Sequence, residues 1–330
     1  MTATVSEELL QLLADGRFHS GQQLAQYLGV SRTAVWKQVK RLESDYGLAM
    51  HAVRGRGYRL VAPLDLLSLS QIRDHLNAET LAQLDKIVIL TCTPSTNASA
   101  SADLPGKSGS GRVWLAEHQT AGRGRRGRDW ISAFGANIYL SLAWRFDMPM
   151  SQLSALSLAA GVATAESLHD LGIQGHTLKW PNDLLVDGLK LAGILVEVSG
   201  EAGGPATAVI GIGINVRMPA APGARIDQPW TDLASVVHEP ISRNALAGNL
   251  IRRLVEVCSA FAVAGIAPLL KRWQTFDKLL GRQVRLHSGD TCIEGLYVGI
   301  AETGALILEN DSGRTEHHAG EVSLRTGGRH

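Results

Sequence analysis

The sequence is poor in cysteine, in net charge and in long apolar segments, and each shortage excludes a class of protein. Its three cysteines, Cys92, Cys258 and Cys292, lie far apart and form no pair or Cys/His group with metal-ligand spacing. This odd, sparse count argues against a disulfide framework and suits a reducing compartment. The formal net charge is only +1, so any attraction to nucleic acid or membrane must be local.

No segment has the features of a membrane span or of a signal peptide. The most apolar helical stretch, residues 153–162, is too short to cross a bilayer. The N-terminal residues are acidic and amphipathic, without a basic region or an apolar run. We therefore expect a soluble, cytoplasmic protein with no membrane partner. Its 330 residues, 45% of them hydrophobic, are enough for two or three domains with proper cores.

The first sixty residues predict three short helices. Ser6 is expected to open the first helix and Gly16 to end it. Ser20 and Gln23 have the spacing of a capping box for the second helix, and Ser31 follows a tight glycine-containing turn to cap the third. Two helices joined in this way are typical of a helix-turn-helix. The third helix carries three apolar residues at helical spacing, Val35, Val39 and Leu42.

Positive charge gathers on the third helix and on the segment that follows it. Residues 53–60, VRGRGYRL, predict a hairpin with a basic tip that would serve as a wing. Cations suit phosphates, and polar side chains near the start of a recognition helix suit base edges. The alternative is a small three-helix bundle with a solvated basic face. The expected DNA-contacting residues are Arg32, Thr33, Trp36, Lys37, Lys40, Arg54 and Arg56.

The central part of the chain mixes strand-like and helix-like segments. A proline-containing linker over residues 61–70 leads into it. Asp187-Gly188 predicts a type I′ hairpin turn, and hairpin-joined strands favour a mixed or antiparallel sheet with packed helices over a doubly wound Rossmann fold. The expected elements are strands near 87–91, 112–117, 138–144, 184–186, 190–198 and 208–216, and a long alanine-rich helix over 154–171.

The C-terminal part predicts two helices and then a small β barrel. The helices fall within residues 242–277, and residues 282–325 alternate apolar and polar between glycine-containing turns. His317 and His318 have no third ligand at suitable spacing, so we expect an exposed strand pair and no metal site. The expected domains are residues 1–62, 63–277 and 278–330 of a multidomain α+β protein.

Residues 122–130, GRGRRGRDW, form an arginine loop in an otherwise almost neutral chain. Ordering nine such residues costs on the order of 10 kcal/mol, because each ordered backbone residue costs ~1–2 kcal/mol and glycine more. We therefore expect the loop to be mobile when empty and to order around an anion. Guanidinium groups bind phosphate through pairs of hydrogen bonds, and glycine lets backbone N–H groups approach the phosphate oxygens. A disordered patch that binds RNA nonspecifically is the alternative. The loop is not a Walker A loop, since GxxxxGK(S/T) is absent, and it is not a GxGxxG motif that opens a helix.

Four motifs resemble those of the bacterial biotin protein ligases that double as biotin operon repressors. They are PSTN at 94–97, EHQTAGRGRRGRDW at 117–130, LKWPNDLLVDGLKLAGILVE at 178–197 and GIGINV at 211–216, in the family's order. Thr120 and Asp129 stand at positions that we take as variable in these motifs. The resemblance implies a winged helix-turn-helix, a class II synthetase-like catalytic core and an SH3-like C-terminal barrel.

The resemblance also implies a two-step reaction. Biotin and ATP, with Mg²⁺, give biotinoyl-5′-AMP and pyrophosphate, and the biotinoyl group then passes to one lysine of the biotin carboxyl carrier protein of acetyl-CoA carboxylase. Charge on the reacting phosphorus must be stabilised by fixed cations, for which Arg125, Arg126 and Arg128 are candidates. Closure of the arginine loop over the adenylate would keep water away from it.

Site residues follow from the matching motifs. Lys190 resembles the family lysine placed near the reacting carboxylate and α-phosphate; the alternative is a solvated lysine just after a turn. The PSTN residues could instead form a turn that caps a helix. The implied biotin contacts are Ser95, Thr96, Asn97, Gln119, Arg123, Gly124, Arg125 and Lys190, and the implied nucleotide contacts are Arg128, Trp130, Lys179, Asn182, Asn215 and Trp230.

The second step needs a neutral acceptor amine. With an ordinary lysine pKa of ~10.4, a free amine at pH 7 costs roughly 4–5 kcal/mol. Asp183, next to Asn182, is our candidate for orienting or deprotonating that amine; the alternative is a turn that pairs with the arginine loop. Operators with two half-sites favour a homodimer, and the family suggests that adenylate binding orders loops at the dimer surface. A transcription factor that only senses biotin, and a lipoate-type ligase, are the competing functions.

Overall fold

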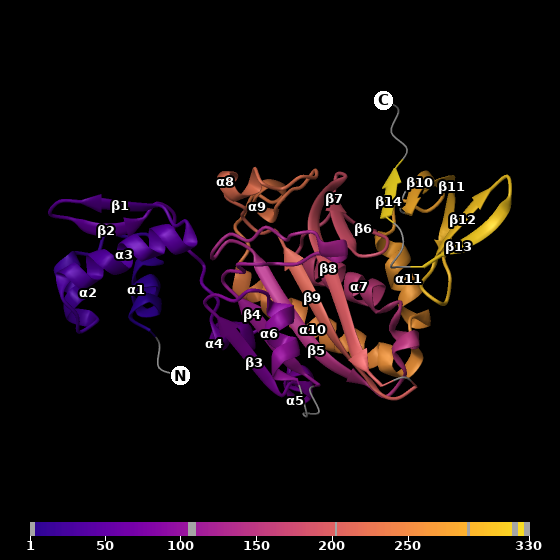
Figure 1. Ribbon diagram of the computed structural model, residues 1–330, viewed down its shortest axis with the longest axis horizontal. Coiled ribbons are helices and arrows are strands. Elements are labelled where there is room, and N and C mark those ends of the chain that lie inside the picture. Colours follow the sequence, from indigo (N-terminus) through magenta and orange to yellow (C-terminus); the bar gives the residue numbers. More distant parts are fainter. Residues whose placement is uncertain (1–3, 105–109, 202, 289–290, 319–322, 327–330) are drawn as a thin grey trace.

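The computed structural model describes residues 4–104, 110–201, 203–288, 291–318 and 323–326. A helical N-terminal part, a central sheet with helices and a C-terminal sheet follow one another along the molecule (Figure 1). This order confirms a multidomain α+β chain with an N-terminal helix-turn-helix, a central mixed sheet and a C-terminal antiparallel sheet.

The N-terminal part is built around its three predicted helices. The capping box of Ser20 and Gln23 is present, and Ser31 caps the third helix. The predicted first cap is wrong: Thr4, not Ser6, caps the first helix in a capping box with Glu7, because Glu7 lies three residues after Thr4. The elements are α1 (Val5–Leu13), α2 (Gly21–Tyr27), α3 (Arg32–Tyr46), β1 (Met50–Val53) and β2 (Gly57–Leu60).

Helix α3 presents the surface that its pattern predicts. Val35, Val39 and Leu42 are buried in the N-terminal core, and β1 and β2 form an antiparallel hairpin after the helix. Arg56 and Arg59 lie over the ring of Phe18, with the guanidinium carbons 4.2 and 4.9 Å from its centroid. All seven residues expected to contact DNA are exposed, namely Arg32, Thr33, Trp36, Lys37, Lys40, Arg54 and Arg56.

A seven-stranded mixed sheet forms the centre of the molecule. Its order is β3-β4-β5-β9-β8-β7-β6; β3 and β4 are parallel, and the remaining neighbours are antiparallel. Asp187 and Gly188 both have positive φ, 49° and 79°, as the predicted type I′ turn requires. The strands are β3 (Lys86–Leu90), β4 (Arg112–Ala116), β5 (Ile138–Phe146), β6 (His176–Lys179), β7 (Asp183–Val186), β8 (Leu189–Gly200) and β9 (Ala206–Ile214).

The two faces of this sheet have different partners. Along β5, Ile138, Leu140 and Leu142 belong to the main core with α7 (Leu156–Asp170) and α10 (Arg243–Ala264). Ala143 faces the other side, in a small cluster with Ala100 of α6 (Thr96–Asp103). Because side chains alternate along a strand, the second face is free to carry polar groups. The other central helices are α4 (Leu69–Arg73), α5 (Ala78–Gln83), α8 (Ala220–Gly223), α9 (Leu233–Val236) and α11 (Ala267–Phe276).

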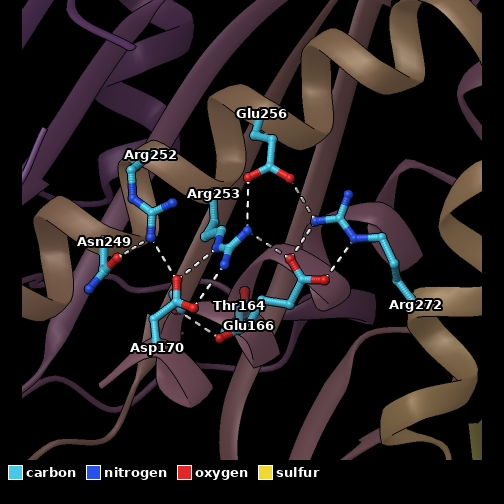
Figure 2. A network of polar contacts seen from close by, with 9 residues as sticks. Thr164, Glu166, Asp170, Asn249, Arg252, Arg253, Glu256 and Arg272 are labelled. Atoms are coloured by element: carbon cyan, nitrogen blue, oxygen red, sulfur yellow. Dashed lines mark hydrogen bonds and ion pairs between the residues drawn. The ribbon is translucent and has the colours of Figure 1, made fainter. Parts of the chain in front are cut away.

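A network of charged side chains joins α7, α10 and α11 on the helical face (Figure 2). Arg253 of α10 contacts Asp170 and Glu166 of α7 and Glu256 of its own helix. Arg272 of α11 also binds Glu166 and Glu256. The hydrogen bonds to Asp170 raise the pKa of Arg253 and the pairing lowers that of Asp170. Each charge faces an opposite one, so the network fixes the three helices relative to one another.

The segment after β2 is not a loose connection. Leu67 is buried, and its backbone N–H donates to Oε1 of Glu117 at 2.5 Å. Glu117 is paired with Arg243 at 2.8 Å, and both are almost fully buried. Arg243 in turn donates to the carbonyl of Asp65 at 2.6 Å. The predicted linker is therefore bound to the end of β4 and the start of α10.

The C-terminal part is an antiparallel sheet of order β13-β12-β11-β10-β14. Its apolar residues Leu286, Tyr297 and Leu308 belong to the same core as the central sheet. Among the described residues, no helix is long and apolar enough to span a membrane. The strands are β10 (Gln283–Ser288), β11 (Thr291–Ile300), β12 (Leu306–Asn310), β13 (Gly313–His317) and β14 (Ser323–Thr326); His318, predicted with His317 to lie in a strand, follows β13.

Candidate functional site

Two neighbouring cavities lie beside the arginine loop. The larger one has a volume of about 350 Å³, and the smaller one about 60 Å³. They share five lining residues: Gly124, Arg125, Trp130, Asn182 and Lys190. A molecule in the smaller cavity would therefore meet a molecule in the larger one at a wall that carries an arginine and a lysine.

The smaller cavity collects every residue that the resemblance assigns to biotin. Thr96 donates from its N–H and its hydroxyl to Oε1 of Gln119, at 2.8 and 3.2 Å. Ser95 is the N-cap residue of α6, but its hydroxyl makes no capping hydrogen bond, so the alternative role as a helix cap is wrong for that group. The members are Ser95, Thr96, Asn97, Gln119, Arg123, Gly124, Arg125 and Lys190.

Asn97 is held by groups that the sequence did not single out. Its amide donates to Oε2 of Glu197 at 2.7 Å, and its carbonyl oxygen accepts from the hydroxyl of Ser141 at 2.6 Å. Glu197 also pairs with Arg123 at 3.1 Å. Ser141 lies on the α6 face of β5, and its one signal in the sequence is a polar residue inside an apolar strand.

Glycines form the floor of the smaller cavity. A Cβ on Gly211 of β9 would lie 2.2 Å from Oδ1 of Asn97, and one on Gly213 would lie 2.5 Å from the ring of Trp130. Neither distance is possible for a real side chain. The alternating glycines of β9 therefore let Asn97 and Trp130 approach the sheet backbone.

The arginine loop is folded as a short hairpin with a 3₁₀ turn at its tip. The N–H of Gly124 donates to the carbonyl of Arg128 at 2.7 Å, and that of Trp130 to Gly122 at 2.9 Å. Arg126 has a left-handed backbone with φ of 58°. Arg126 and Arg128 are exposed at the rim of the larger cavity. Closure of this loop on a ligand stays a prediction, because it concerns a change between two states.

Arg125 is the loop arginine that turns inward. Its Nη1 donates to Oδ1 of Asn182 at 3.1 Å. Burial, and then the charge of Arg126, lower the pKa of Arg125. The expected alternative, that the Asn-Asp turn pairs with the loop, therefore holds for Asn182. The same amide donates through Nδ2 to the carbonyl of Ile194 at 2.9 Å, which ties the turn to β8.

Lys190 lies at the wall between the cavities, and the alternative of a solvated lysine is wrong. Its side chain is 16% exposed, and its Nζ is 2.8 Å from Oδ1 of Asp183. The same ammonium lies 5.7 Å from the centre of a Trp130 ring. Asp183 is the first residue of β7 and lines the larger cavity. The ion pair places a cation and a carboxylate together at the shared wall.

The larger cavity collects every residue that the resemblance assigns to the nucleotide. Asn215 is buried and donates to the carbonyl of Thr231 at 3.1 Å, while Trp230 packs on Gly223 of α8. Arg225 and Trp180 also line the cavity and were missed. Arg225 stands outside the matching motifs, whereas Trp180 lies within the motif at 178–197, between Lys179 and Asn182, and that position was a usable signal. The expected members are Arg128, Trp130, Lys179, Asn182, Asn215 and Trp230.

Comparisons with known proteins give one consistent answer. Residues 89–215 match the Biotin/lipoate A/B protein ligase family, residues 5–59 an HTH domain, and residues 279–325 the Biotin protein ligase C terminal domain. The chain is 42% identical to Bifunctional ligase/repressor BirA of Escherichia coli, over 98% of both chains. It is 32% identical to the protein of that name from Bacillus subtilis, over 98% of this chain and 100% of the relative.

A solved structure agrees with the sequence relatives. The biotin protein ligase from Aquifex aeolicus in complex with biotin and ATP has 26% sequence identity and a TM-score of 0.63. The match covers 74% of this chain and 100% of the other.

Proposed function

This chain belongs to the biotin protein ligase family and carries a helix-turn-helix repressor domain, and from that premise we propose how its residues divide the reaction. Biotin binds in the smaller cavity and ATP in the larger one. The observation that carries this assignment is the shared wall of Arg125, Asn182 and Lys190. A carboxylate at the end of one cavity can meet an α-phosphate at the end of the other only at that wall.

In the first step, a carboxylate oxygen of biotin attacks the α-phosphorus and pyrophosphate leaves. Lys190, already beside a carboxylate 2.8 Å away, moves its charge to the new anhydride oxygens. Arg125 is fixed by Asn182 before the reaction, so it needs little reorganisation to stabilise the developing charge. Arg126 and Arg128 at the rim are suited to the departing pyrophosphate.

Mg²⁺ fits this site as part of its ATP complex. The ion usually keeps several waters and takes one or two carboxylates together with phosphate oxygens. Asp129, Asp183 and Asp227 all line the larger cavity, so suitable oxygen donors are present there. Bound with ATP, the ion would neutralise phosphate charge during the displacement.

In the second step, the ε-amine of the acceptor lysine on the biotin carboxyl carrier protein attacks the acyl carbon and AMP leaves. Asp183 lines the larger cavity and is the carboxylate paired with Lys190 of the shared wall, and this pairing ends when the lysine turns to the adenylate. The freed carboxylate orients the incoming amine and accepts its proton. Asp183→Ala is therefore expected to slow transfer more than adenylate formation.

The assay that tests this function is biotin-dependent exchange of pyrophosphate into ATP. Biotin should support exchange, whereas lipoate and octanoate should support at most a small fraction of that rate. Exchange with lipoate at an equal rate would favour a lipoate-type ligase, and no exchange would favour a sensor without ligase activity. Single-turnover transfer from preformed adenylate then separates the two steps for Asp183→Ala; equal slowing of both would remove its assignment.

The N-terminal part is proposed to act as a winged helix-turn-helix on operator DNA, with the β1–β2 hairpin as the wing. Its exposed cations lie on α3 and on the hairpin tip. The C-terminal sheet is proposed to be SH3-like and the central sheet class II synthetase-like.

A homodimer is proposed to form through the open side of β8. Past Ile194, whose N–H and carbonyl both bind Asn182, this strand pairs with β9 alone, so its backbone is available to another strand. The adjoining groove is lined by the arginine loop and by residues of β8. A ligand that orders the loop would thus change the dimer surface, which couples biotin supply to repression. Sedimentation equilibrium with and without biotin and ATP tests this; an unchanged dimerisation constant would exclude the coupling.

A further inference from the structure

The turn between β11 and β12 reaches from the C-terminal sheet into the catalytic domain. The carbonyl of Gly304 accepts a hydrogen bond from Nε1 of Trp180 at 3.0 Å. The neighbouring carbonyl, that of Thr303, accepts from the hydroxyl of Ser154 at 3.2 Å. Within the turn, the N–H of Ala301 donates to Ala305 at 2.8 Å. The turn is therefore closed on itself while two of its carbonyls point into the catalytic domain.

The fit of this turn leaves no spare room. Gly304 has φ of +84°, and a Cβ there would lie 2.5 Å from Cβ of Ala155 and 3.0 Å from its Cα. Both the backbone conformation and the close approach require glycine. Glycine at 304 thus sets the depth to which the turn enters, and that depth brings its carbonyl within reach of Trp180.

Trp180 connects the turn to the larger cavity. It is 1% exposed, so its N–H has no access to water and depends on the Gly304 carbonyl. The same residue contributes to the cavity lining, and it lies between Lys179 and the Pro181-Asn182 turn, which also line the cavity. The position of the indole therefore fixes how this side of the cavity presents its polar groups.

We infer that Trp180 is a positioning residue for the nucleotide, and that the C-terminal domain sets its position through the Gly304 carbonyl. The inference rests on the proposed function, because it takes the larger cavity as the ATP site. The C-terminal sheet then acts in adenylate formation through a backbone carbonyl, and none of its described side chains lines the larger cavity. Biotin should be unaffected, because Trp180 does not line the smaller cavity.

The chain supplies a matched control in Trp273. Its Nε1 donates to Oδ2 of Asp277 at 3.1 Å, and it is 2% exposed. It lies on α11 in the same core, but it lines neither cavity. Trp273→Phe and Trp180→Phe thus each remove one indole N–H···O hydrogen bond and keep an aromatic ring; the acceptor is a carboxylate for Trp273 and a backbone carbonyl for Trp180.

The experiment measures biotin-dependent pyrophosphate exchange and thermal unfolding for the full-length protein, Trp180→Phe, Trp273→Phe and Gly304→Ala. We expect Trp180→Phe to raise the KM for ATP about five- to tenfold, with kcat within about threefold and the KM for biotin within about twofold of the parent. Trp273→Phe should lower the melting temperature by a similar amount and leave the KM for ATP within about twofold. Gly304→Ala should reproduce the rise in the KM for ATP.

Two results would overturn the inference: an unchanged KM for ATP in Trp180→Phe, or an equal rise in Trp273→Phe. If Gly304→Ala fails to fold, the two phenylalanine variants still decide the matter. Absence of exchange in the parent protein would instead refute the proposed function, so the two failures are distinguishable.

Discussion

The two small domains are attached to the catalytic domain in different ways. The N-terminal helices have a core of their own, to which the catalytic domain contributes one buried aromatic residue, Phe134. Its ring lies 4.4 Å from that of Tyr46, at the end of α3. Among the residues that the structure describes, the C-terminal sheet has no separate core: Leu286, Tyr297 and Leu308 belong to the cluster that also holds α7 and the central sheet.

The difference separates an attached domain from an integral one. The N-terminal domain can change its orientation at the cost of a few contacts, such as the aromatic pair and the hydrogen bond from Thr91 to Glu7 at 2.5 Å. The C-terminal sheet cannot leave without opening the core beneath the catalytic sheet. We therefore expect DNA binding and catalysis to be separable by mutation, and catalysis and the C-terminal sheet not to be.

The largest expected effect comes from Tyr297→Ala. Tyr297 is 1% exposed and donates to Oδ2 of Asp277 at 2.5 Å. Its removal leaves a cavity and a lost hydrogen bond, which together should cost about 5 kcal/mol of unfolding free energy. In calorimetry the unfolding transition of the catalytic domain should be lost, and the pyrophosphate exchange activity should be lost with it. A melted C-terminal sheet with full exchange activity would break the comparison.

Phe134→Ala should lower the free energy of unfolding by a smaller amount, and it should do so in the N-terminal domain. Truncating this buried ring is expected to destabilise the N-terminal domain by about 3 kcal/mol, because the ring belongs to that domain's core. Calorimetry should separate a low-temperature N-terminal transition from an unchanged catalytic one. Tyr46→Phe keeps the ring contact and serves as control. Equal shifts of both transitions would show that the two domains unfold as one.

A smaller effect sharpens the same separation. Lys37→Gln on α3 should reduce the slope of log affinity for operator DNA against log salt by about 0.9, because one phosphate contact is lost, and should leave exchange unchanged. Lys86→Gln, an exposed lysine at the start of β3, is the control. Titration by fluorescence anisotropy at several salt concentrations measures both slopes. A change in the slope for Lys86→Gln alone would indicate that the DNA-binding surface lies on the catalytic domain.

The smallest effect is a pH dependence that arises at Glu7, which caps α1 together with Thr4 and also accepts from Thr91 of the catalytic domain. Hydrogen bonds from the N–H of Thr4 and the hydroxyl of Thr91 lower the pKa of Glu7 below its ordinary value of 4.5. A depressed folded-state pKa adds stability above the unfolded value, which is lost as the pH falls through the folded value. The unfolding temperature of the N-terminal domain should therefore fall as the pH drops below about 4.5 in the parent protein, and it should fall less in Glu7→Gln. An identical acid dependence in both would show that Glu7 does not contribute to the acid sensitivity of the N-terminal domain.

The local part of this structure could be predicted and the long-range part could not. Ser20 and Ser31 cap their helices from within three residues, and Asp187-Gly188 makes its turn alone. The motifs also brought together residues that line the two cavities, although they missed Arg225, and the roles of these residues stay predictions. The bond from Trp180 to Gly304 joins residues 124 positions apart, and the pairing of Glu117 with Arg243 spans a similar distance. No periodicity or motif links such partners.

The glycine floor of the smaller cavity has a consequence for enzyme engineering. Gly211 and Gly213 have no side chain to trim, so the floor cannot be lowered by substitution. A variant intended to accept a bulkier vitamin analogue must remove volume from the side chains that line the cavity, among which Trp130, packed on Gly213, is the largest. Adding a methyl group to the floor would instead displace the side chains that pack on it, because a Cβ on Gly211 would lie 2.2 Å from Oδ1 of Asn97 and one on Gly213 2.5 Å from the ring of Trp130.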